Sequence, residues 1–306
     1  MKKKDIKLII SIIIFVLVLG YYLYEGYIDN KTINKREATK EVFKDENLKI
    51  YFLDVGQADS ILINNKDKYM LIDAGNNEDG EKLVNYFKEL GIKKFDYVVG
   101  THAHEDHIGG MDDIINNFDI NTFYMPDAIT TTKTFEDVLD ALENKKLAFN
   151  TPEVDKSFNF SNTKITTLYT GSNTSDLNNT SLVFRLDYGS NCFILTGDAT
   201  STTENKILNK DIDCEVLKVG HHGSHYSSNP NFLDKVSPKY AIISAGINNI
   251  YNHPSDITIN KLNDRNIKIY RTDKDGTILM TSDGANIKFK KIKTDTNGWY
   301  YEICSR

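Results

Sequence analysis

Cysteine is scarce in this chain, and its scarcity narrows what the protein can be. The 306 residues contain three cysteines, Cys192, Cys214 and Cys304, without the close pairing of a zinc knuckle or the density of a disulfide scaffold. Cys192 and Cys214 fall in apolar runs, so we expect them to be small core residues rather than metal ligands. Low cysteine content is compatible with an exported protein but does not demonstrate export.

The chain also lacks an excess of positive charge. It carries 37 Lys/Arg against 43 Asp/Glu, a formal net charge of −6. Residues 1–47 hold nine Lys/Arg and seven Asp/Glu, which leaves a net charge of −8 for the rest. Nucleic-acid binders usually show a broad basic footprint, so composition gives that function no global support. A hydrophobic content of 40% is ordinary for a globular protein with a sizeable core.

One segment departs from globular composition. A cluster of lysines within the first seven residues precedes an uncharged, mostly apolar run over 8–24 that ends in tyrosines. Such a run is near the minimum length that spans a bilayer, and tyrosines suit the membrane interface. No small-x-small pattern precedes Glu25, which argues against a cleaved signal peptide. No cysteine follows the run, which argues against a lipoprotein anchor. We therefore expect residues 1–25 to be an uncleaved signal anchor, with a cleaved signal peptide as the alternative.

The anchor predicts a single-pass protein of the cell membrane with its lysines in the cytoplasm and everything after Glu25 outside. Residues 26–47 are polar and charged, and we interpret them as a stalk. We expect one folded domain over 48–292, followed by a tail over 293–306. The chain shows no internal repeat.

The hydrophobic pattern of the expected domain predicts strands and helices in alternating groups. The predicted strands are 48–55, 59–64, 69–75, 95–99, 165–168, 182–186, 192–196, 214–219, 240–244, 268–271, 277–281 and 286–290. The predicted helices are 81–90, 111–118, 135–144, 203–208, 231–236 and 257–263. This order, in two halves, fits an α/β (α+β) sandwich of two sheets with helices outside.

The segment Thr101–Gly110 concentrates residues that bind metals. It holds three of the seven histidines, His102, His104 and His107, together with Asp106, directly after an apolar run. Imidazole and carboxylate are the usual ligands of borderline divalent metals such as zinc or manganese. A strand that ends in a tight turn would point His102 and His104 into one cavity and Asp106 and His107 towards a neighbouring point. The split predicts two metals in one pocket, with the next helix starting after the glycines.

Two later strand ends carry matching chemistry. The apolar strand over 193–196 leads to Asp198, whose two carboxylate oxygens can bridge two cations. The strand over 216–219 leads to His221, His222 and His225. The two clusters thus contain six of the seven histidines, and the seventh is His253. A shared metal centre explains this distribution better than histidines scattered over a surface.

The order of these motifs resembles the metallo-β-lactamase superfamily, and more narrowly the hydrolase domain of the ComEC/Rec2 family of DNA-uptake proteins. The resemblance covers about 48–290, and its most specific runs are Phe52–Ser60, Asn178–Ser181, Leu195–Asp198 and Leu217–Ser224. It implies an αββα sandwich with a site for two divalent metal ions, zinc or manganese, between the sheets.

The resemblance also implies roles for individual residues. The implied ligands are His102 and His104 for the first metal, Asp106 and His107 for the second, Asp198 as the bridge, and either His221 or His222 for the second metal. The superfamily usually has a further histidine shortly before the bridging aspartate, but none lies between His107 and Asp198. Asn179 or a water would stand in for it. Asp73 would support the ligands without binding metal.

The implied reaction is hydrolysis of a phosphodiester by a metal-activated hydroxide, which Asp106 and Asp198 would orient. Lys218, His225 and His253 are candidate proton donors, although Lys218 could equally be a solvated strand residue. We expect an extracellular phosphodiesterase or nuclease whose partners are the membrane and a nucleic acid or other phosphodiester. The alternatives are a cell-envelope phosphoesterase similar to phosphorylcholine esterase, and a non-catalytic binding module with a degenerate metal site.

Overall fold

The computed structural model describes residues 18–21, 23–24, 47–172 and 175–292. The chain divides into two compact units, Met1–Lys44 with Ile303–Arg306 and Asp45–Glu302, and the second unit is the folded domain. Most of the expected anchor, nearly all of the expected stalk and the whole expected tail lie outside the described residues. Among the described residues, no helix combines the length and the apolarity that a bilayer span requires.

The folded domain is built on two sheets, as far as the described residues show. The eight strands of sheet A lie in the order β15 (Ile287–Ile292), β14 (Thr277–Ser282), β1 (Leu48–Phe52), β2 (Ile61–Asn65), β3 (Lys68–Ile72), β4 (Lys94–Val99), β5 (Asp119–Tyr124) and β6 (Phe149–Asn150). The seven strands of sheet B lie in the order β13 (Lys268–Arg271), β12 (Tyr240–Ile243), β11 (Val216–Lys218), β10 (Asn191–Leu195), β9 (Val183–Tyr188), β8 (Thr163–Tyr169) and β7 (Ser157–Phe160).

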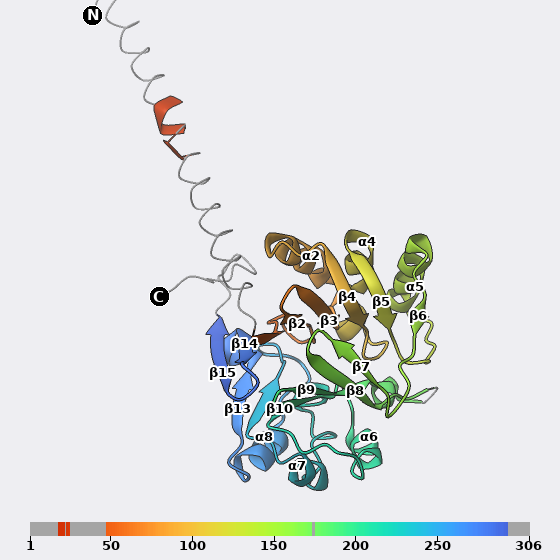
Figure 1. The fold of residues 1–306 in the computed structure, drawn as a ribbon, viewed down its shortest axis with the longest axis vertical. Coiled ribbons are helices and arrows are strands. Elements are labelled where there is room, and N and C mark those ends of the chain that lie inside the picture. The colour runs from red at the N-terminus through yellow and green to blue at the C-terminus, as the bar shows by residue number, and fades with distance from the viewer. Residues whose placement is uncertain (1–17, 22, 25–46, 173–174, 293–306) are drawn as a thin grey trace, which may run out of the picture. The chain divides into compact units, whose positions relative to one another are not determined.

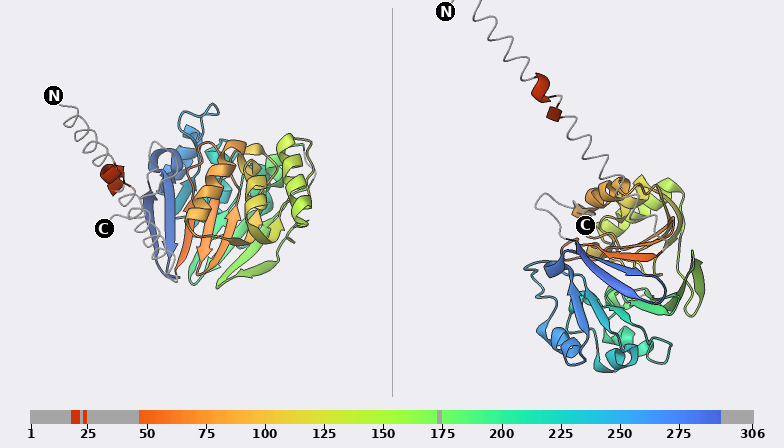
Figure 2. Two further views of the ribbon diagram at one scale, coloured as in Figure 1. Left: turned by 90° about the horizontal axis from the view of Figure 1, so that it is seen from above. Right: turned by 60° about the vertical axis from the view of Figure 1, so that its left-hand side comes forward.

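Helices cover the outer face of each sheet (Figures 1 and 2). The helices against sheet A are α2 (Gly80–Glu89), α4 (Met111–Asn117) and α5 (Lys133–Lys145). The helices against sheet B are α6 (Ser201–Lys206), α7 (Pro230–Val236) and α8 (Asp256–Asn263). The layers therefore run helix, sheet, sheet, helix, which confirms the expected sandwich.

Side-chain alternation explains how each sheet faces two cores at once. In β10, Phe193 and Leu195 belong to the core between the sheets, while Cys192 and Ile194 belong to the core between sheet B and its helices. Successive strand residues point to opposite faces, so a strand buried on both sides is apolar throughout. This pattern was visible in the sequence and placed most strands within a few residues of their observed bounds.

Several elements were not predicted. The sequence analysis left out β5, β6, β7 and the short helices α3 (Glu105–Ile108) and α9 (Thr272–Asp275). β5 pairs in parallel with β4, yet most of its side chains are polar or partly exposed, so hydrophobic pattern could not reveal it. The first strand is also shorter than predicted, because the chain leaves sheet A at Leu53 and the Asp54 amide donates to the Thr277 hydroxyl.

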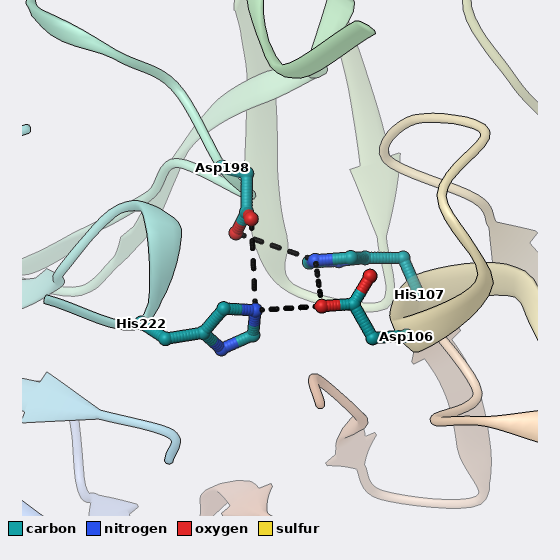
Figure 3. Close-up of side chains that lie close together, drawn as sticks. All are labelled: Asp106, His107, Asp198 and His222. Carbon is teal, nitrogen blue, oxygen red and sulfur yellow. Dashed lines mark hydrogen bonds and ion pairs between the residues drawn. The ribbon is translucent and has the colours of Figure 1, made fainter. Parts of the chain in front are cut away.

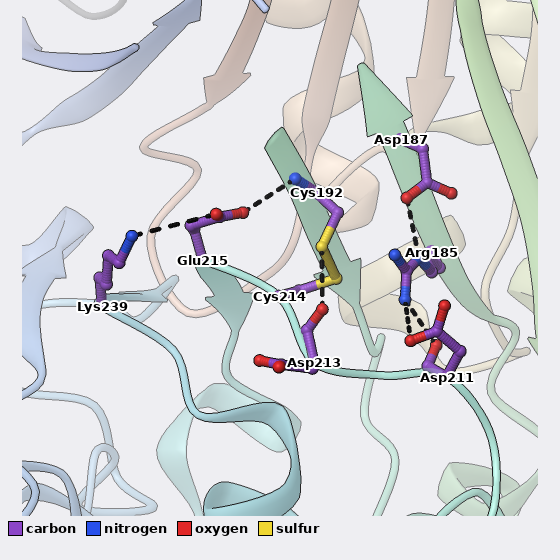
Figure 4. The surroundings of a disulfide bond; sticks show 8 residues. All are labelled: Arg185, Asp187, Cys192, Asp211, Asp213, Cys214, Glu215 and Lys239. Atoms are coloured by element: carbon purple, nitrogen blue, oxygen red, sulfur yellow. Dashed lines mark hydrogen bonds and ion pairs between the residues drawn. A yellow bond between two sulfur atoms is a disulfide. The ribbon is translucent and has the colours of Figure 1, made fainter. Parts of the chain in front are cut away.

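Cys192 and Cys214 are buried core residues, as expected, but they also form a disulfide that was not predicted (Figure 4). β10 and β11 run in parallel as neighbours with Phe193 opposite Val216, which brings the two cysteines to a Cα–Cα distance of 5.0 Å. Beside the bridge, the amide of Cys192 donates to a carboxylate oxygen of Glu215 over 3.1 Å. The bridge forms because β10 and β11 pair, and this pairing cannot be inferred from the spacing of the two cysteines in the sequence.

We expect loss of the disulfide to lower the free energy of unfolding by about 3 kcal/mol, the order predicted for closing a loop of this length. The bridge joins residues 22 positions apart. Urea unfolding of the double variant Cys192→Ser/Cys214→Ser measures the effect, with Cys304→Ser as the matched control. Equal midpoints for the double variant and the control would show that the bridge does not stabilise the fold.

Candidate metal centre

The metal-binding motif lies where β4 leaves sheet A. Asp73, which follows β3, accepts hydrogen bonds from the Thr101 amide and hydroxyl, each over 2.7 Å. The chain then enters α3, which carries Asp106 and His107. The helix predicted after the glycines is observed as α4, whereas the short helix α3 before them was not predicted. Gly109 is required because a Cβ there would lie 2.2 Å from the Asn77 nitrogen.

Four of the predicted ligands converge (Figure 3). Each of Asp106, His107, Asp198 and His222 offers one ligand atom, and these atoms lie within 4.8 Å of one another. His107 Nε2 is 3.3 Å from an oxygen of Asp198, and His222 Nε2 is 3.2 Å from Asp106 and 3.5 Å from Asp198. α3 thus supplies two ligands, and the ends of β10 and β11 supply one each from sheet B.

Hydrogen bonds on the far side of each ring fix which nitrogen faces the centre. His107 Nδ1 lies 2.8 Å from the Asp73 carboxylate, and His222 Nδ1 lies 3.1 Å from the carbonyl oxygen of Ser244. An imidazole that donates from Nδ1 presents Nε2 with a free lone pair, the arrangement found around metal-bound histidines. His107 Nε2 and one oxygen of Asp198 are also buried without a hydrogen-bond partner. Two imidazoles and two carboxylates therefore form a donor set that fits zinc or manganese.

The charges of the four groups depend on one another. Burial alone would lower the pKa of His107, but Asp198 and Asp73 outweigh it and hold that pKa well above its usual value. Burial likewise opposes the upward shift in the pKa of His222, which Asp198 and Asp106 cause. In return, His222 and His107 hold the pKa of Asp198 well below its usual value despite burial. The two carboxylates are thus kept ionised and attract positive charge to this point.

The structure shows which of the two adjacent histidines, His221 or His222, points into the four-ligand group, a choice that the sequence left open. His221 and His222 have φ angles of 52° and 50°, in the left-handed region that non-glycine residues seldom adopt. This turn, in η3 (His221–Gly223), directs buried His222 into the four-ligand group. His221 lines the cavity with its Nε2 4.0 Å from Asp198. Consecutive strained residues concentrate at functional sites, where surrounding contacts enforce them.

The pair expected to hold the first metal lies beside this group but outside it. His102 Nε2 and His104 Nδ1 are 3.0 Å apart, and the His102 and His107 ring centroids are 4.1 Å apart. His102 is fully buried, which lowers its pKa, so its ring is neutral and available as a ligand. A second group, Asp59, Asp73 and His107, also meets within 4.8 Å. We interpret it as structural, since Asp73 already hydrogen bonds His107.

Lys218 does not face the centre, contrary to its candidate role as a proton donor. Its side chain is completely buried, and its ammonium lies 2.8 Å from an oxygen of Asp59 and donates to the carbonyl of Val219. Asp59 in turn lies 3.7 Å from His222 Nδ1. The alternative of a solvated strand residue is also wrong. Lys218 forms a buried ion pair between the sheets, behind His222.

Two further candidates lie away from the cluster. His225 is exposed and packs against the Tyr226 ring at a centroid distance of 3.9 Å. Asn179 does not replace the missing histidine, because its amide oxygen accepts from Thr200 and its nitrogen donates to Asp176. The neighbouring Asn178 lines the cavity instead, and its amide oxygen is buried without a hydrogen-bond partner.

The centre opens into a cavity of about 770 Å³. The described residues that line it are Val55, Gly56, Gln57, Asn76, Glu78, Ala103, His104, Glu105, Asp106, Thr132, Asn178, Asp198, His221, His222, Tyr251 and His253. Sequence reasoning missed Gln57, Asn178 and Tyr251 as cavity residues. The first two lie in runs that carried the family resemblance, but Tyr251 had no signal in the sequence.

Comparison with known proteins agrees with this geometry. The model of the Metallo-beta-lactamase superfamily matches residues 53–247. The chain belongs to this superfamily. Within it, the chain is 31% identical over 247 residues to ComE operon protein 3 of Bacillus subtilis, covering 74% of this chain and 32% of that protein. It is 26% identical over 252 residues to Competence protein ComA of Neisseria gonorrhoeae, covering 80% and 34%. The resemblance to the ComEC/Rec2 family is therefore confirmed.

The chain spans about a third of the length of these curated relatives. Among solved structures, the metallo-beta-lactamase fold protein YhfI from Bacillus subtilis has a TM-score of 0.53 at 12% identity, over 80% of this chain and 100% of that one. CmlA, a diiron beta-hydroxylase from Streptomyces venezuelae, has a TM-score of 0.51 at 14% identity, over 74% and 53%. At these identities the structures show a shared fold and nothing more about this chain.

A buried carboxylate holds the segment that follows the centre's histidines. Glu204 of α6 accepts hydrogen bonds from the amides of Ser228 and Asn229 over 2.6 and 2.8 Å. Burial raises the pKa of Glu204 to about 7, although these hydrogen bonds and Lys261 oppose the shift. The ionised form is thus costly in the folded protein, and stability depends on pH through this group.

We expect Glu204 to make the wild-type protein less stable as pH rises. The stabilising contribution of protonated Glu204 to the free energy of unfolding is fully present below the unfolded pKa near 4.5. It is lost as pH rises to the folded pKa of about 7. In that window the gap between wild type and Glu204→Gln should change by about 3 kcal/mol, which urea unfolding with chelator present would measure. Glu143→Gln, an exposed change on α5, is the control. A constant gap would contradict the assignment.

Proposed function

We propose that this protein is a metal-dependent phosphodiesterase, a nuclease of the ComEC/Rec2 type. The observation that carries the proposal is the convergence of ligand atoms from Asp106, His107, Asp198 and His222 within 4.8 Å. Hydrogen bonds from the two Nδ1 atoms, to Asp73 and to the Ser244 carbonyl, orient both imidazole rings. Metal ions bound there would be zinc or manganese, would neutralise charge on a phosphoryl oxygen and would lower the pKa of a bound water.

The residues around that position have separable roles. His107 and His222 would each bind through Nε2, and Asp106 and Asp198 would bind through carboxylate oxygens. Asp198 lies close to both histidines and 4.0 Å from His221, so it is placed to bridge two ions and to orient an attacking water. His102 and His104 would hold the ion at the other position. Burial of Asp198 and His107 keeps the ligands out of bulk water and strengthens their electrostatic effect.

The leaving group has a candidate hydrogen-bond donor at the rim of the cavity. His253 lines the cavity, and its ring centroid lies 5.6 Å from that of His221. Burial lowers the pKa of His253 to about 4, with His221 adding to the shift. A neutral imidazole can still donate the hydrogen on one nitrogen while it accepts through the other. We therefore assign His253 as the residue that donates a hydrogen bond to the leaving-group oxygen.

The names of the curated relatives favour a nucleic acid as the substrate, since one is Competence protein ComA of Neisseria gonorrhoeae and another is Recombination protein 2 of Haemophilus influenzae. A phosphodiester with a cationic leaving group, such as a phosphocholine ester, is the second candidate. The described cavity residues include the acidic Glu78 and Glu105 and no Lys or Arg, which suits a positively charged group. A non-catalytic binding module is the remaining alternative.

Asp198→Ala should lower kcat on a phosphodiester by more than about a hundredfold, because it removes the ligand shared by both positions. The ectodomain with manganese or zinc is assayed on single-stranded DNA, on bis(p-nitrophenyl) phosphate and on a phosphocholine ester. Asp234→Ala, which breaks an exposed ion pair on α7, is the matched control. Full activity of Asp198→Ala would exclude the two-metal mechanism. Metal binding without hydrolysis of any substrate would identify a binding module.

We further propose that residues 1–25 anchor the domain outside the cell membrane. The apolar run after the lysines supports this, and so does the Cys192–Cys214 disulfide, because such bonds persist mainly in oxidising compartments. The full chain should remain with membranes after a carbonate wash, and protease added to intact protoplasts should digest the domain. Release by carbonate, or protection from the protease, would contradict the proposal.

A further inference from the structure

An exposed aromatic side chain stands at the mouth of the cavity. Tyr251 lines the cavity and is 61% exposed, and its ring lies against that of His253 at a centroid distance of 5.9 Å and an interplanar angle of 29°. The same loop exposes Ile247 and Ile250, at 73% and 85%. Large apolar groups gathered at this exposure beside a catalytic cavity usually indicate a binding surface.

The loop that presents Tyr251 is held in place at its base. The Asn249 amide nitrogen donates to the carbonyls of Gly246 and His253, over 2.9 and 2.6 Å, and its oxygen accepts from the His253 amide over 2.9 Å. The Gly246 amide donates to the Gln57 side chain over 3.0 Å, which ties the loop to sheet A's side of the cavity. The aromatic pair is therefore preorganised, so that a ligand stacked on it would cost little ordering entropy.

The charges of the cavity limit how a substrate can be held there. Its described lining carries four carboxylates, Glu78, Glu105, Asp106 and Asp198, and no Lys or Arg. Metal ions at the centre would bind one phosphate, but no cation of the lining would bind the phosphates on either side. Affinity beyond the scissile phosphate has to come from groups without negative charge, and among the described lining residues Tyr251 offers a large and exposed aromatic ring.

We propose that Tyr251, backed by His253, is a stacking platform for the nucleobase next to the scissile phosphodiester of a single strand. This inference rests on the proposed phosphodiesterase function. A flat base matches the nearly parallel pair of rings, whereas a quaternary ammonium group is normally enclosed by several aromatic faces. In a duplex, neighbouring base pairs cover both faces of a base, so only an unpaired base can stack on Tyr251.

The experiment distinguishes recognition of the nucleobase from recognition of the sugar-phosphate backbone. Oligothymidylate and an all-abasic oligomer of the same length carry the same phosphates, so any difference in kcat/KM with manganese reports on the base. The wild-type protein should prefer oligothymidylate by about tenfold, the order expected for one base–aromatic stack. Tyr251→Ala should abolish that preference, because its loss should fall on oligothymidylate and not equally on the abasic oligomer. Tyr251→Phe, which keeps the ring, and Ile250→Ala, which changes an exposed neighbour, should both retain the preference.

Salt provides a second measurement. With one phosphate bound, the logarithm of kcat/KM should fall against the logarithm of salt concentration with a slope no steeper than about −1, since each neutralised phosphate contributes about −0.7 in single strands. Equal cleavage of both oligomers by the wild-type protein, or an equal loss on both in Tyr251→Ala, would overturn the stacking platform and leave the phosphodiesterase intact. Cleavage of neither oligomer would overturn both proposals. A preference for the phosphocholine ester that Tyr251→Ala removes would reassign the platform to a cation.

Discussion

The buried carboxylate of Asp73 is the interaction on which the metal centre depends. It accepts two hydrogen bonds from Thr101 and contacts His107 Nδ1 at 2.8 Å, so one side chain joins the ends of β3 and β4 to α3. Burial raises the pKa of Asp73, while His107 and the Thr101 amide oppose that shift. An isolated carboxylate in such a place would be strongly destabilising, and it is tolerated because each contact stabilises its ionised form.

The centre also requires the two sheets to stay in register with each other. Asp106 and His107 come from the sheet A side, whereas Asp198 and His222 follow β10 and β11 of sheet B. The buried pair of Lys218 and Asp59 crosses the same interface behind His222. A small slide of one sheet against the other would separate ligands within this compact group. The apolar core between the sheets and the buried ion pair therefore contribute to metal binding as well as to folding.

Sequence reasoning found the parts of this protein whose signal is local. Alternating apolar residues located β1 and β10, and the runs around His102–His107, Asp198 and His221–His222 contain the four side chains that converge in the structure. Contacts made by the tertiary fold were out of reach. The Cys192–Cys214 bridge follows from the pairing of β10 with β11, and the choice of His222 over His221 follows from a left-handed turn. The polar strand β5 is specified by its neighbour β4 and not by its own pattern.

The two proposed metal positions differ in how firmly the fold would support them. Asp73 and Ser244 orient the two imidazoles of the group that contains Asp106 and Asp198, from positions that are largely closed to water. At the other position His102 is buried, but His104 is partly exposed, and Asn179 uses its amide on Thr200 and Asp176. A partly exposed ligand loses more rotational freedom on binding than a buried one, so we expect His104 to contribute less affinity. No histidine lies between His107 and Asp198, so the proposed two-metal centre would be asymmetric, with one position built into the core and the other open towards the cavity.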